Sequence, residues 1–207
     1  MKLVLITPEN SLADEWAVIN HAFELGIDNL YIRKPKDNLF SFQEYLNKIP
    51  LQYLYKVVIP YAVAKGLNVA NEIGFNLKEE DLGVVNVLRN KGRRISASFH
   101  TLDSIKKWER EIDWCFLSPV FDSISKKGYS ATFEMGNLQK HLVHIKDCDV
   151  IGLGGVRAEN ITQLIDTGFD GCAVLGSIWE KERTEDKIDA LERVINKRNL
   201  LENRVVH

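Results

Sequence analysis

Two glycine-bearing segments in the C-terminal half have the residue types of an anion-binding loop. Gly154 and Gly155 come directly after an apolar run that ends at Leu153, and Gly176 and Ser177 follow a second apolar run. Glycine lets backbone N–H groups approach an anion closely, and the start of a following helix adds a favourable dipole. The two segments therefore predict a phosphate site made of backbone groups. The alternative is that these glycines serve only tight turns.

Hydroxyl and ammonium groups gather in the longest turn-rich connection of the chain, which spans residues 120–133. Ser123, Ser125 and Lys126 stand close together in it, and Lys127 follows. Hydroxyls beside lysines can hydrogen-bond and neutralise a phosphate or diphosphate. A connection of this length in a compact domain is usually functional, so we expect it to act as a lid. The alternative is a solvated, charged loop.

Four further side chains follow predicted strands and could do chemistry. Arg33 in YIRKP can present a planar fork to phosphate oxygens. In ISASFHT, Ser98 can donate to an anion and His100 can move a proton near neutral pH. Asp81 in KEEDL can ligate Mg²⁺ through a carboxylate oxygen. The alternatives are a surface ion pair for the arginine, a structural histidine, and an acidic residue that merely starts a helix.

The elements that must position these residues alternate along the chain. Short apolar runs predict strands, and segments of helical period between them predict helices. The predicted strands are Lys2 to Thr7, Asn29 to Arg33, Lys56 to Pro60, Ile73 to Leu77, Arg94 to Ser98, Trp114 to Ser118, Asp149 to Leu153 and Gly171 to Gly176. Predicted helices include Leu12 to Leu25, Asn160 to Thr167 and Glu185 to Asn196, with a short extra helix at Ile178 and Trp179.

Eight such strand–helix units predict an α/β protein with one (β/α)8 TIM barrel spanning residues 1–207 as a single domain. An open doubly wound sheet is the alternative. The first strand is not followed by GxGxxG, which argues against the dinucleotide-binding version of that sheet. In a barrel the active site lies on the loops after the strands, and the loops after strands seven and eight commonly bind phosphate.

The composition excludes several classes of partner. The formal net charge is −2, with 45% hydrophobic and 27% charged residues, so there is no general attraction to nucleic acid or to an anionic membrane. The apolar opening MKLVLIT is too short for a signal peptide or a membrane span. We expect a cytoplasmic protein that binds small phosphorylated molecules; self-association into a homo-oligomer stays open. The three cysteines lack CxxC spacing and are expected to be reduced, packed thiols.

Taken together, these segments resemble the thiamine phosphate synthase family and its close relatives, the thiazole tautomerases, over nearly the whole chain. The strand-two arginine of the family matches Arg33, and the serine of its strand-five motif matches Ser98. The acidic residue that closes its strand-four Gln-Glu-Asp motif matches Asp81. Its strand-six motif, Gly-Pro followed by Thr-x-Thr-Lys, is similar to Ser118 and Pro119 followed by Ser123, Ser125 and Lys126.

The resemblance implies that diphosphate leaves a hydroxymethylpyrimidine diphosphate and that the nitrogen of a thiazole phosphate captures the pyrimidine carbocation. It implies diphosphate binding by Arg33, Ser98 and Lys126, which with His100 form the catalytic group. It implies Mg²⁺ as cofactor, held by Asp81. The thiazole phosphate is assigned to Ser123, Ser125, Gly154, Gly155, Gly176 and Ser177.

Departures from the family pattern keep two other functions open. Ile59 and Pro60 stand where synthases usually carry Asn-Asp, so the second metal carboxylate is absent and the Mg²⁺ site is weakened. Pro35 replaces the lysine that normally follows the arginine by two residues, although Lys34 and Lys36 flank it. Lys78, which stands in the strand-four motif, could also supply the missing positive charge. A thiazole tautomerase needs neither diphosphate nor the second carboxylate, and a noncatalytic barrel that binds thiazole phosphate is the third hypothesis.

Overall fold

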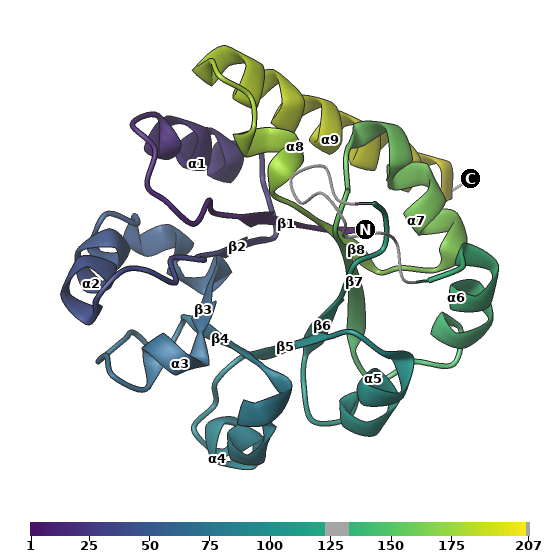
Figure 1. The fold of residues 1–207 in the computed structure, drawn as a ribbon, viewed down its shortest axis with the longest axis horizontal. Coiled ribbons are helices and arrows are strands. Elements are labelled where there is room, and N and C mark those ends of the chain that lie inside the picture. Colours follow the sequence, from purple (N-terminus) through teal and green to yellow (C-terminus); the bar gives the residue numbers. More distant parts are fainter. Residues whose placement is uncertain (123–132, 206–207) are drawn as a thin grey trace.

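The chain folds into a closed barrel of parallel strands surrounded by helices, as Figure 1 shows. The computed structural model describes residues 1–122 and 133–205. Strands β1 to β8 lie in sequence order, and β8 pairs back with β1. The predicted (β/α)8 TIM barrel is therefore confirmed, and the open sheet is excluded.

The observed strands agree with the predicted ones to within two residues at each end. They are β1 Lys2–Ile6, β2 Asn29–Tyr31, β3 Val57–Pro60, β4 Gly74–Leu77, β5 Ile95–Phe99, β6 Trp114–Leu117, β7 Asp149–Leu153 and β8 Gly171–Val174. Because β2 ends at Tyr31, Arg33 lies on the loop that follows the strand.

The helices and helical turns lie outside the barrel. The α-helices are α1 Glu15–Glu24, α2 Leu39–Asn47, α3 Tyr61–Ala64, α4 Val85–Asn90, α5 Leu102–Trp108, α6 Met135–Leu142, α7 Ile161–Thr167, α8 Gly176–Trp179 and α9 Thr184–Val205. Three 3-10 turns, η1 Leu51–Lys56, η2 Glu79–Val84 and η3 Ala158–Asn160, complete the described elements. The short helix predicted after strand eight is α8, and the last helix runs beyond its predicted end.

Alternating side chains of the strands build two separate cores. In β1, Leu3 and Leu5 belong to a large cluster shared with the helices, whereas Val4 and Ile6 belong to a smaller one. The smaller cluster contains strand residues only, so it is the interior of the barrel; its other buried members are Val58, Trp114, Phe116, Ile151 and Ala173. A strand buried on both faces is expected for a parallel barrel with helices outside.

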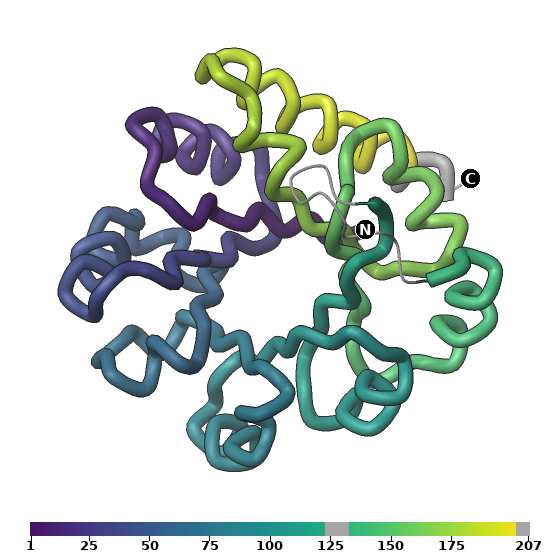
Figure 2. Tube along the Cα trace, viewed as in Figure 1, coloured from purple at the N-terminus to yellow at the C-terminus, as the bar shows by residue number. Residues whose placement is uncertain are grey.

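Closure of the barrel depends on the pairing of β1 with β8. Lys2 lies opposite Gly171 and Leu3 opposite Cys172, and Figure 2 shows the first and last strands side by side. A Cβ on Gly171 would stand 2.7 Å from the Lys2 carbonyl oxygen and would also overlap the Ile151 side chain. Only glycine fits here, because both neighbouring strands approach the backbone closely.

A half-buried arginine, Arg94, connects elements at the face of the barrel where the strands begin. Arg94 donates to Asn29 Oδ1 at 3.2 Å and to the carbonyl oxygens of Val57 at 3.2 Å and Glu72 at 3.3 Å. Partial burial lowers the pKa of Arg94, and Asp113 opposes that shift. These contacts join the starts of three strands, so this face holds the barrel together and leaves the other face for binding.

The cysteines behave as the sequence predicts. Cys115, Cys148 and Cys172 are free and buried. A hydrogen bond with Cys148 and burial raise the pKa of the Cys115 thiol, and burial raises the pKa of Cys172 to about 12. Thiols held protonated in this way are unreactive.

Within the described residues, no helix is both long and apolar enough to cross a membrane.

Replacing Gly171 by alanine is expected to lower the free energy of unfolding by about 1–3 kcal/mol, because the added methyl group overpacks the junction of β1 and β8. Gly83→Ala is the matched control, since a Cβ added at Gly83 would have no atom within 4 Å and its φ is not positive. Urea denaturation followed by circular dichroism measures both. Equal stability of the two variants would contradict the role given to Gly171.

Candidate active site

The candidate residues meet at one rim of the barrel because all strands run in parallel and their C-terminal ends share a face. Arg33 follows β2, Asp81 lies in η2 after β4, and Ser98 lies in β5 with His100 just beyond it. The glycine loops follow β7 and β8. Ser123, Ser125 and Lys126 lie outside the described residues, as does most of the lid predicted at 120–133.

The loop after β7 has a conformation that needs both of its glycines. Gly154 has φ of 102° and Gly155 has φ of 64°, values that L side chains rarely adopt. A Cβ at Gly154 would lie 3.0 Å from Pro119 Cα, and one at Gly155 would lie 2.8 Å from Phe121 Cβ. A tight turn is thus one reason for these glycines, as the alternative interpretation proposed, and phosphate binding stays a prediction to be tested.

Backbone hydrogen bonds also join the β7 loop to the segment that follows β6. Val120 N–H donates to the Leu153 carbonyl at 3.0 Å, and Phe121 N–H donates to the Gly154 carbonyl at 3.1 Å. The chain leading toward 123–132 is therefore anchored on the β7 loop. The two carbonyls are engaged by these bonds.

Sequence reasoning missed the residue that holds this loop in place. Asn160 Nδ2 donates to the Gly155 carbonyl at 2.9 Å, and Asn160 Oδ1 accepts from Arg157 N–H at 2.9 Å. One side-chain amide therefore bridges both ends of the turn that follows Gly155. The signal available in the sequence was an asparagine at the start of a predicted helix, a position where its side chain often bonds to nearby backbone.

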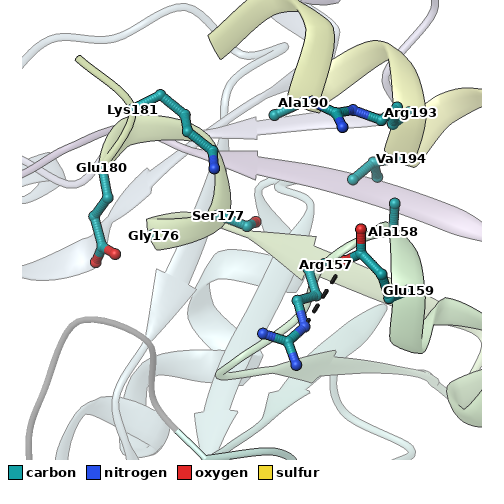
Figure 3. A pocket seen from close by; sticks show the side chains of 10 residues that line it. All are labelled: Arg157, Ala158, Glu159, Gly176, Ser177, Glu180, Lys181, Ala190, Arg193 and Val194. Atoms are coloured by element: carbon teal, nitrogen blue, oxygen red, sulfur yellow. Dashed lines mark ion pairs between the residues drawn. The ribbon is translucent and has the colours of Figure 1, made fainter. Parts of the chain in front are cut away.

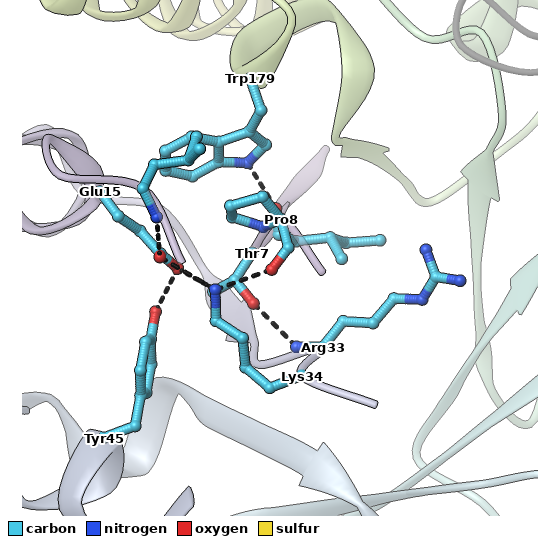
Figure 4. A network of polar contacts seen from close by, with 9 residues as sticks. Thr7, Pro8, Glu15, Arg33, Lys34, Tyr45 and Trp179 are labelled. Carbon is cyan, nitrogen blue, oxygen red and sulfur yellow. Dashed lines mark hydrogen bonds and ion pairs between the residues drawn. The ribbon is translucent and has the colours of Figure 1, made fainter. Parts of the chain in front are cut away.

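Helix α8 is tied to the barrel by a buried tryptophan. Trp179 Nε1 donates to the Ile6 carbonyl at the end of β1, over 2.7 Å. This bond joins the end of the short helix to the first strand (Figure 4). The start of α8, at Gly176 and Ser177, lines the same cavity as Arg157, which follows the β7 loop. Phosphate binding by these residues stays a prediction.

A cavity of about 310 Å³ lies between η3, α8 and α9. Its charged lining residues are Arg157, Glu159, Glu180, Lys181 and Arg193. Figure 3 shows the Lys181 side chain extending toward Ser177, while Arg157 pairs with Glu159 at 3.8 Å. Ser177 Oγ is buried and has no hydrogen-bond partner in the part of the chain that the structure describes. Buried hydroxyl groups are normally hydrogen-bonded, so a ligand atom is a natural partner for this one.

Arg33 is half-buried and pairs with Glu9. Arg33 Nη2 lies 2.8 Å from Glu9 Oε1, and both side chains are about one-third exposed, at 35% and 38%. The backbone N–H of Arg33 donates to Thr7 Oγ1 at 2.8 Å, which fixes the loop on β1. The surface ion pair offered as the alternative does exist. Because it is partly exposed, the pair is weak enough to exchange for a ligand phosphate.

Lys34 does not compensate for the missing lysine of the family motif. Its Nζ is buried and contacts Glu15 Oε1 at 2.8 Å, Glu15 Oε2 at 2.9 Å and the Pro8 carbonyl at 2.8 Å. Tyr45 donates to Glu15 Oε1 at 2.5 Å. Figure 4 shows Lys34 and Arg33 extending to opposite sides of the loop. A charged pair buried this deeply is committed to its partner.

The other two lysines that could compensate, Lys36 and Lys78, are exposed. Lys36 Nζ lies 3.4 Å from Asn10 Oδ1, and Lys78 Nζ lies 3.8 Å from Glu80 Oε1, where the two side chains of the second pair are 73% and 76% exposed. Exposed pairs of this kind contribute little and leave the ammonium groups able to move. Compensation by Lys36 or Lys78 therefore stays a prediction.

His100 is exposed, and one of its ring nitrogens is occupied. Nδ1 lies 2.8 Å from the Ser118 carbonyl oxygen. A carbonyl oxygen only accepts, so this bond places the proton of the neutral ring on Nδ1 and leaves Nε2 as a lone-pair base. The histidine is thus oriented by the end of β6 with its basic nitrogen unused among the described contacts.

Asp81 is partly buried and makes no side-chain hydrogen bond or ion pair with the rest of the described chain. No group of three or more His, Cys, Asp or Glu residues that could hold a metal ion occurs within residues 1–122 and 133–201. Ile59 is buried in the helix-side core and Pro60 ends β3, so neither offers a ligand. One carboxylate alone needs the oxygens of a substrate to complete a Mg²⁺ site.

Sequence reasoning also missed a buried amide network on β2, β4 and β5. Asn76 is buried, and its Nδ2 lies 3.1 Å from Ser98 Oγ and 3.4 Å from Tyr31 Oη. Ser96 Oγ donates to Asn76 Oδ1 at 2.9 Å. Asn76 stands where the strand-four motif of the family usually has a histidine, and Tyr31 opens the YIRKP segment, in which only Arg33 and its neighbouring lysines were given roles. Residue types and spacing therefore gave no sign of the network.

Parallel barrels often bind phosphorylated small molecules in the loops after their last two strands, where this chain has its glycines. The thiamine monophosphate synthase family model matches residues 3–178. The chain therefore belongs to that family, and the resemblance inferred from its motifs is confirmed.

Curated relatives that match this chain at low identity are named thiamine-phosphate synthases. The chain is 24% identical to the thiamine-phosphate synthase of Clostridium acetobutylicum over 204 residues, which cover 95% of each chain. It is 25% identical to the thiamine-phosphate synthase of Bacillus cereus, with 91% of this chain and 88% of the relative covered.

Solved structures share the fold. Thiamine phosphate pyrophosphorylase from Bacteroides thetaiotaomicron superposes with a TM-score of 0.74 at 23% identity, covering 97% of this chain and 98% of that one. The Pyrococcus furiosus enzyme gives a TM-score of 0.75 at 22% identity, covering 95% and 94%.

Removing the buried lysine tests whether Lys34 is structural. Lys34→Met leaves the Glu15 charge buried without its partner, so we expect the free energy of unfolding to fall by about 3–5 kcal/mol. Adding Glu15→Gln removes that charge and keeps an acceptor for Tyr45, so the double variant should be more stable than the single one. Urea denaturation compares them; a double variant less stable than Lys34→Met would contradict a structural role for the pair.

Proposed function

We propose that this protein is a thiamine phosphate synthase, which couples hydroxymethylpyrimidine diphosphate with thiazole phosphate to give thiamine phosphate and diphosphate. The observation that carries the proposal is the presence of two separate groups suited to anions on one rim. Arg33 and Ser98 stand on the β2 and β5 side, and the glycine loops stand on the β7 and β8 side. A reaction that joins two phosphorylated molecules needs two such anion-binding sites.

On the diphosphate side, the chain supplies charge and alignment. Arg33 offers a planar set of donors that can exchange Glu9 for phosphate oxygens. Ser98 adds a hydroxyl donor, and Lys126 is proposed to add a cation as the loop after β6 closes. These groups stabilise the negative charge that develops as the bond between carbon and oxygen breaks, so no nucleophile from the protein is needed.

On the thiazole side, backbone groups hold the phosphate. The N–H groups of Gly154 and Gly155 and the start of α8 at Gly176 are suited to phosphate oxygens, with Ser177 Oγ as an additional donor. Ser123 and Ser125 are proposed to complete this grip. Holding the phosphate aligns the thiazole nitrogen for attack on the cationic carbon of the pyrimidine.

Asp81 fits a Mg²⁺ ion that is shared with the substrate. Its carboxylate is partly exposed and lacks a described partner, and Mg²⁺ commonly binds through one carboxylate with substrate phosphates and water. When bound, Mg²⁺ would neutralise charge on the leaving diphosphate. Because Ile59 and Pro60 bring no second carboxylate, we expect weaker Mg²⁺ binding than in relatives that carry the Asn-Asp pair.

One observation favours a second candidate, a thiazole tautomerase. His100 has its Nδ1 held by the Ser118 carbonyl, which leaves Nε2 as a base that could take a proton from a thiazole ring carbon. This reaction needs the phosphate-binding site on the thiazole side, but it needs no diphosphate and no second metal carboxylate. A barrel that binds thiazole phosphate without turnover is the remaining hypothesis, and the same experiments separate it.

Purified protein incubated with both substrates and Mg²⁺ is expected to form thiamine phosphate, measured by chromatography after oxidation to a fluorescent product. Arg33→Ala removes charged hydrogen bonds worth about 1.5–3 kcal/mol, so kcat/KM should fall roughly 10- to 150-fold. Lys91→Ala is the matched control, because Lys91 is exposed at the end of α4, just before β5 begins, and so lies away from the rim. Absence of product from the wild-type protein would defeat the synthase proposal.

The tautomerase candidate is tested by following the isomerisation of thiazole carboxylate phosphate by NMR. If His100 is the base, His100→Asn should lower kcat by about 100-fold or more with little change in KM, because proton transfer contributes roughly 10²–10⁴-fold. Turnover that is unaffected by the substitution would exclude His100. Calorimetric binding of thiazole phosphate without turnover in either assay would instead indicate the noncatalytic barrel.

A further inference from the structure

A buried amide sets the direction of two hydrogen bonds at the rim. Asn76, on β4, is only 4% exposed, and its Nδ2 contacts Ser98 Oγ on β5 and Tyr31 Oη on β2. An amide nitrogen donates and never accepts. Toward Asn76, both hydroxyl oxygens are therefore acceptors.

The amide oxygen lies on the other side of the side chain, toward Ser96. Ser96 Oγ donates to Asn76 Oδ1 at 2.9 Å, and this serine is itself buried below the rim. The amide oxygen therefore faces Ser96, and the amide nitrogen faces the two rim hydroxyls. Three strands carry these groups, so the arrangement is set by the pairing of β2, β3, β4 and β5 and does not depend on a loop.

Each rim hydroxyl consequently keeps its own proton for another acceptor. Neither Tyr31 nor Ser98 donates a side-chain hydrogen bond to any other group in the described parts of the chain. Burial raises the pKa of Tyr31, so its hydroxyl stays protonated at neutral pH. Both residues are only partly buried, which leaves them reachable from the rim.

The surroundings of Tyr31 suit a small molecule. Its ring lies 5.6 Å from the Phe116 ring, centroid to centroid, and packs on the apolar interior of the barrel. Leu153 and Leu175, at the ends of β7 and β8, pack on the same interior cluster and are also partly buried. A pair of hydroxyl donors thus stands beside an apolar floor, which is the usual composition of a ligand site.

We propose that Tyr31 is a substrate-binding residue, whose hydroxyl acts with that of Ser98 as a pair of donors for acceptor atoms of the ligand, and that Asn76 is the positioning residue that keeps both donors directed at it. The ligand chemistry is an unprotonated acceptor, either a heteroaromatic ring nitrogen or a phosphoryl oxygen. This inference rests on the proposed function for the location of the substrate.

Isothermal titration calorimetry with two probes tests the proposal. The probes are inorganic pyrophosphate with Mg²⁺, which offers only phosphoryl oxygens, and 4-amino-5-hydroxymethyl-2-methylpyrimidine, which offers ring nitrogens without phosphate. Tyr31→Phe keeps the ring and removes one donor, so the Kd for one probe should rise about 2- to 12-fold. The probe that is affected identifies the acceptor. Tyr55→Phe, on an exposed tyrosine of η1, is the matched control.

Asn76→Asp separates a positioning role from a purely structural one. A carboxylate accepts both hydroxyl protons and reverses the polarity of the network at nearly constant shape, so binding should weaken more than in Tyr31→Phe. Asn76→His, whose ring N–H can donate in place of the amide, should recover part of the affinity. Thermal unfolding confirms that each variant is folded, and Tyr31→Phe alone decides the question if Asn76→Asp does not fold.

The outcomes distinguish this inference from the proposed function. Unchanged affinity of Tyr31→Phe for both probes overturns the inference even if thiamine phosphate is formed, and so does a wild-type protein that binds neither probe. Weaker binding by Tyr31→Phe supports the inference even if the synthase assay shows no product, in which case only the proposed reaction fails.

Discussion

The pairing of β8 with β1 is the contact that gives the barrel a single rim. A parallel barrel that closes must bring all of its strand ends to one face, whatever their separation in sequence. Gly171 permits this closure because Lys2 and Ile151 approach its backbone too closely for any side chain. Residues as distant as Arg33 and Gly176 then face the same space.

The two faces of the barrel use their polar groups differently. On the N-terminal face, Arg94 satisfies carbonyl and amide oxygens from neighbouring elements, and its donors are used within the protein. On the C-terminal face, the hydroxyl protons of Tyr31 and Ser98, Nε2 of His100 and Oγ of Ser177 lack partners among the described residues. Groups left unsatisfied on one side of an otherwise satisfied fold indicate where a ligand is expected.

The departures from the family motifs affect the two proposed anion-binding sites to different degrees. The glycine loops would bind through backbone N–H groups, which side-chain substitution does not remove, and the shape of the β7 loop is independently maintained by packing against residues 119–122. The diphosphate grip depends on side chains, and here Pro35, Ile59 and Pro60 have replaced charged or amide groups of the family. The match over residues 3–178 shows the family, and the departures bear on the proposed diphosphate chemistry.

Local signals in the sequence were enough to predict the barrel, the order of its strands and the location of the candidate loops, because apolar periodicity and the positions of glycine report on each element separately. The hydrogen-bond partner of each polar group could be identified only from the tertiary structure. From sequence, Lys34 looked as able as Lys36 to neutralise a diphosphate, but it is buried against Glu15, which is 19 positions away. Tyr31 and Asn76 were given no role from sequence, and the contacts of Asn76 with Tyr31 and Ser98 form only when β2, β4 and β5 come together. Hydrogen-bond partners between strands depend on register and burial, which the closed barrel sets and which no local stretch of sequence contains.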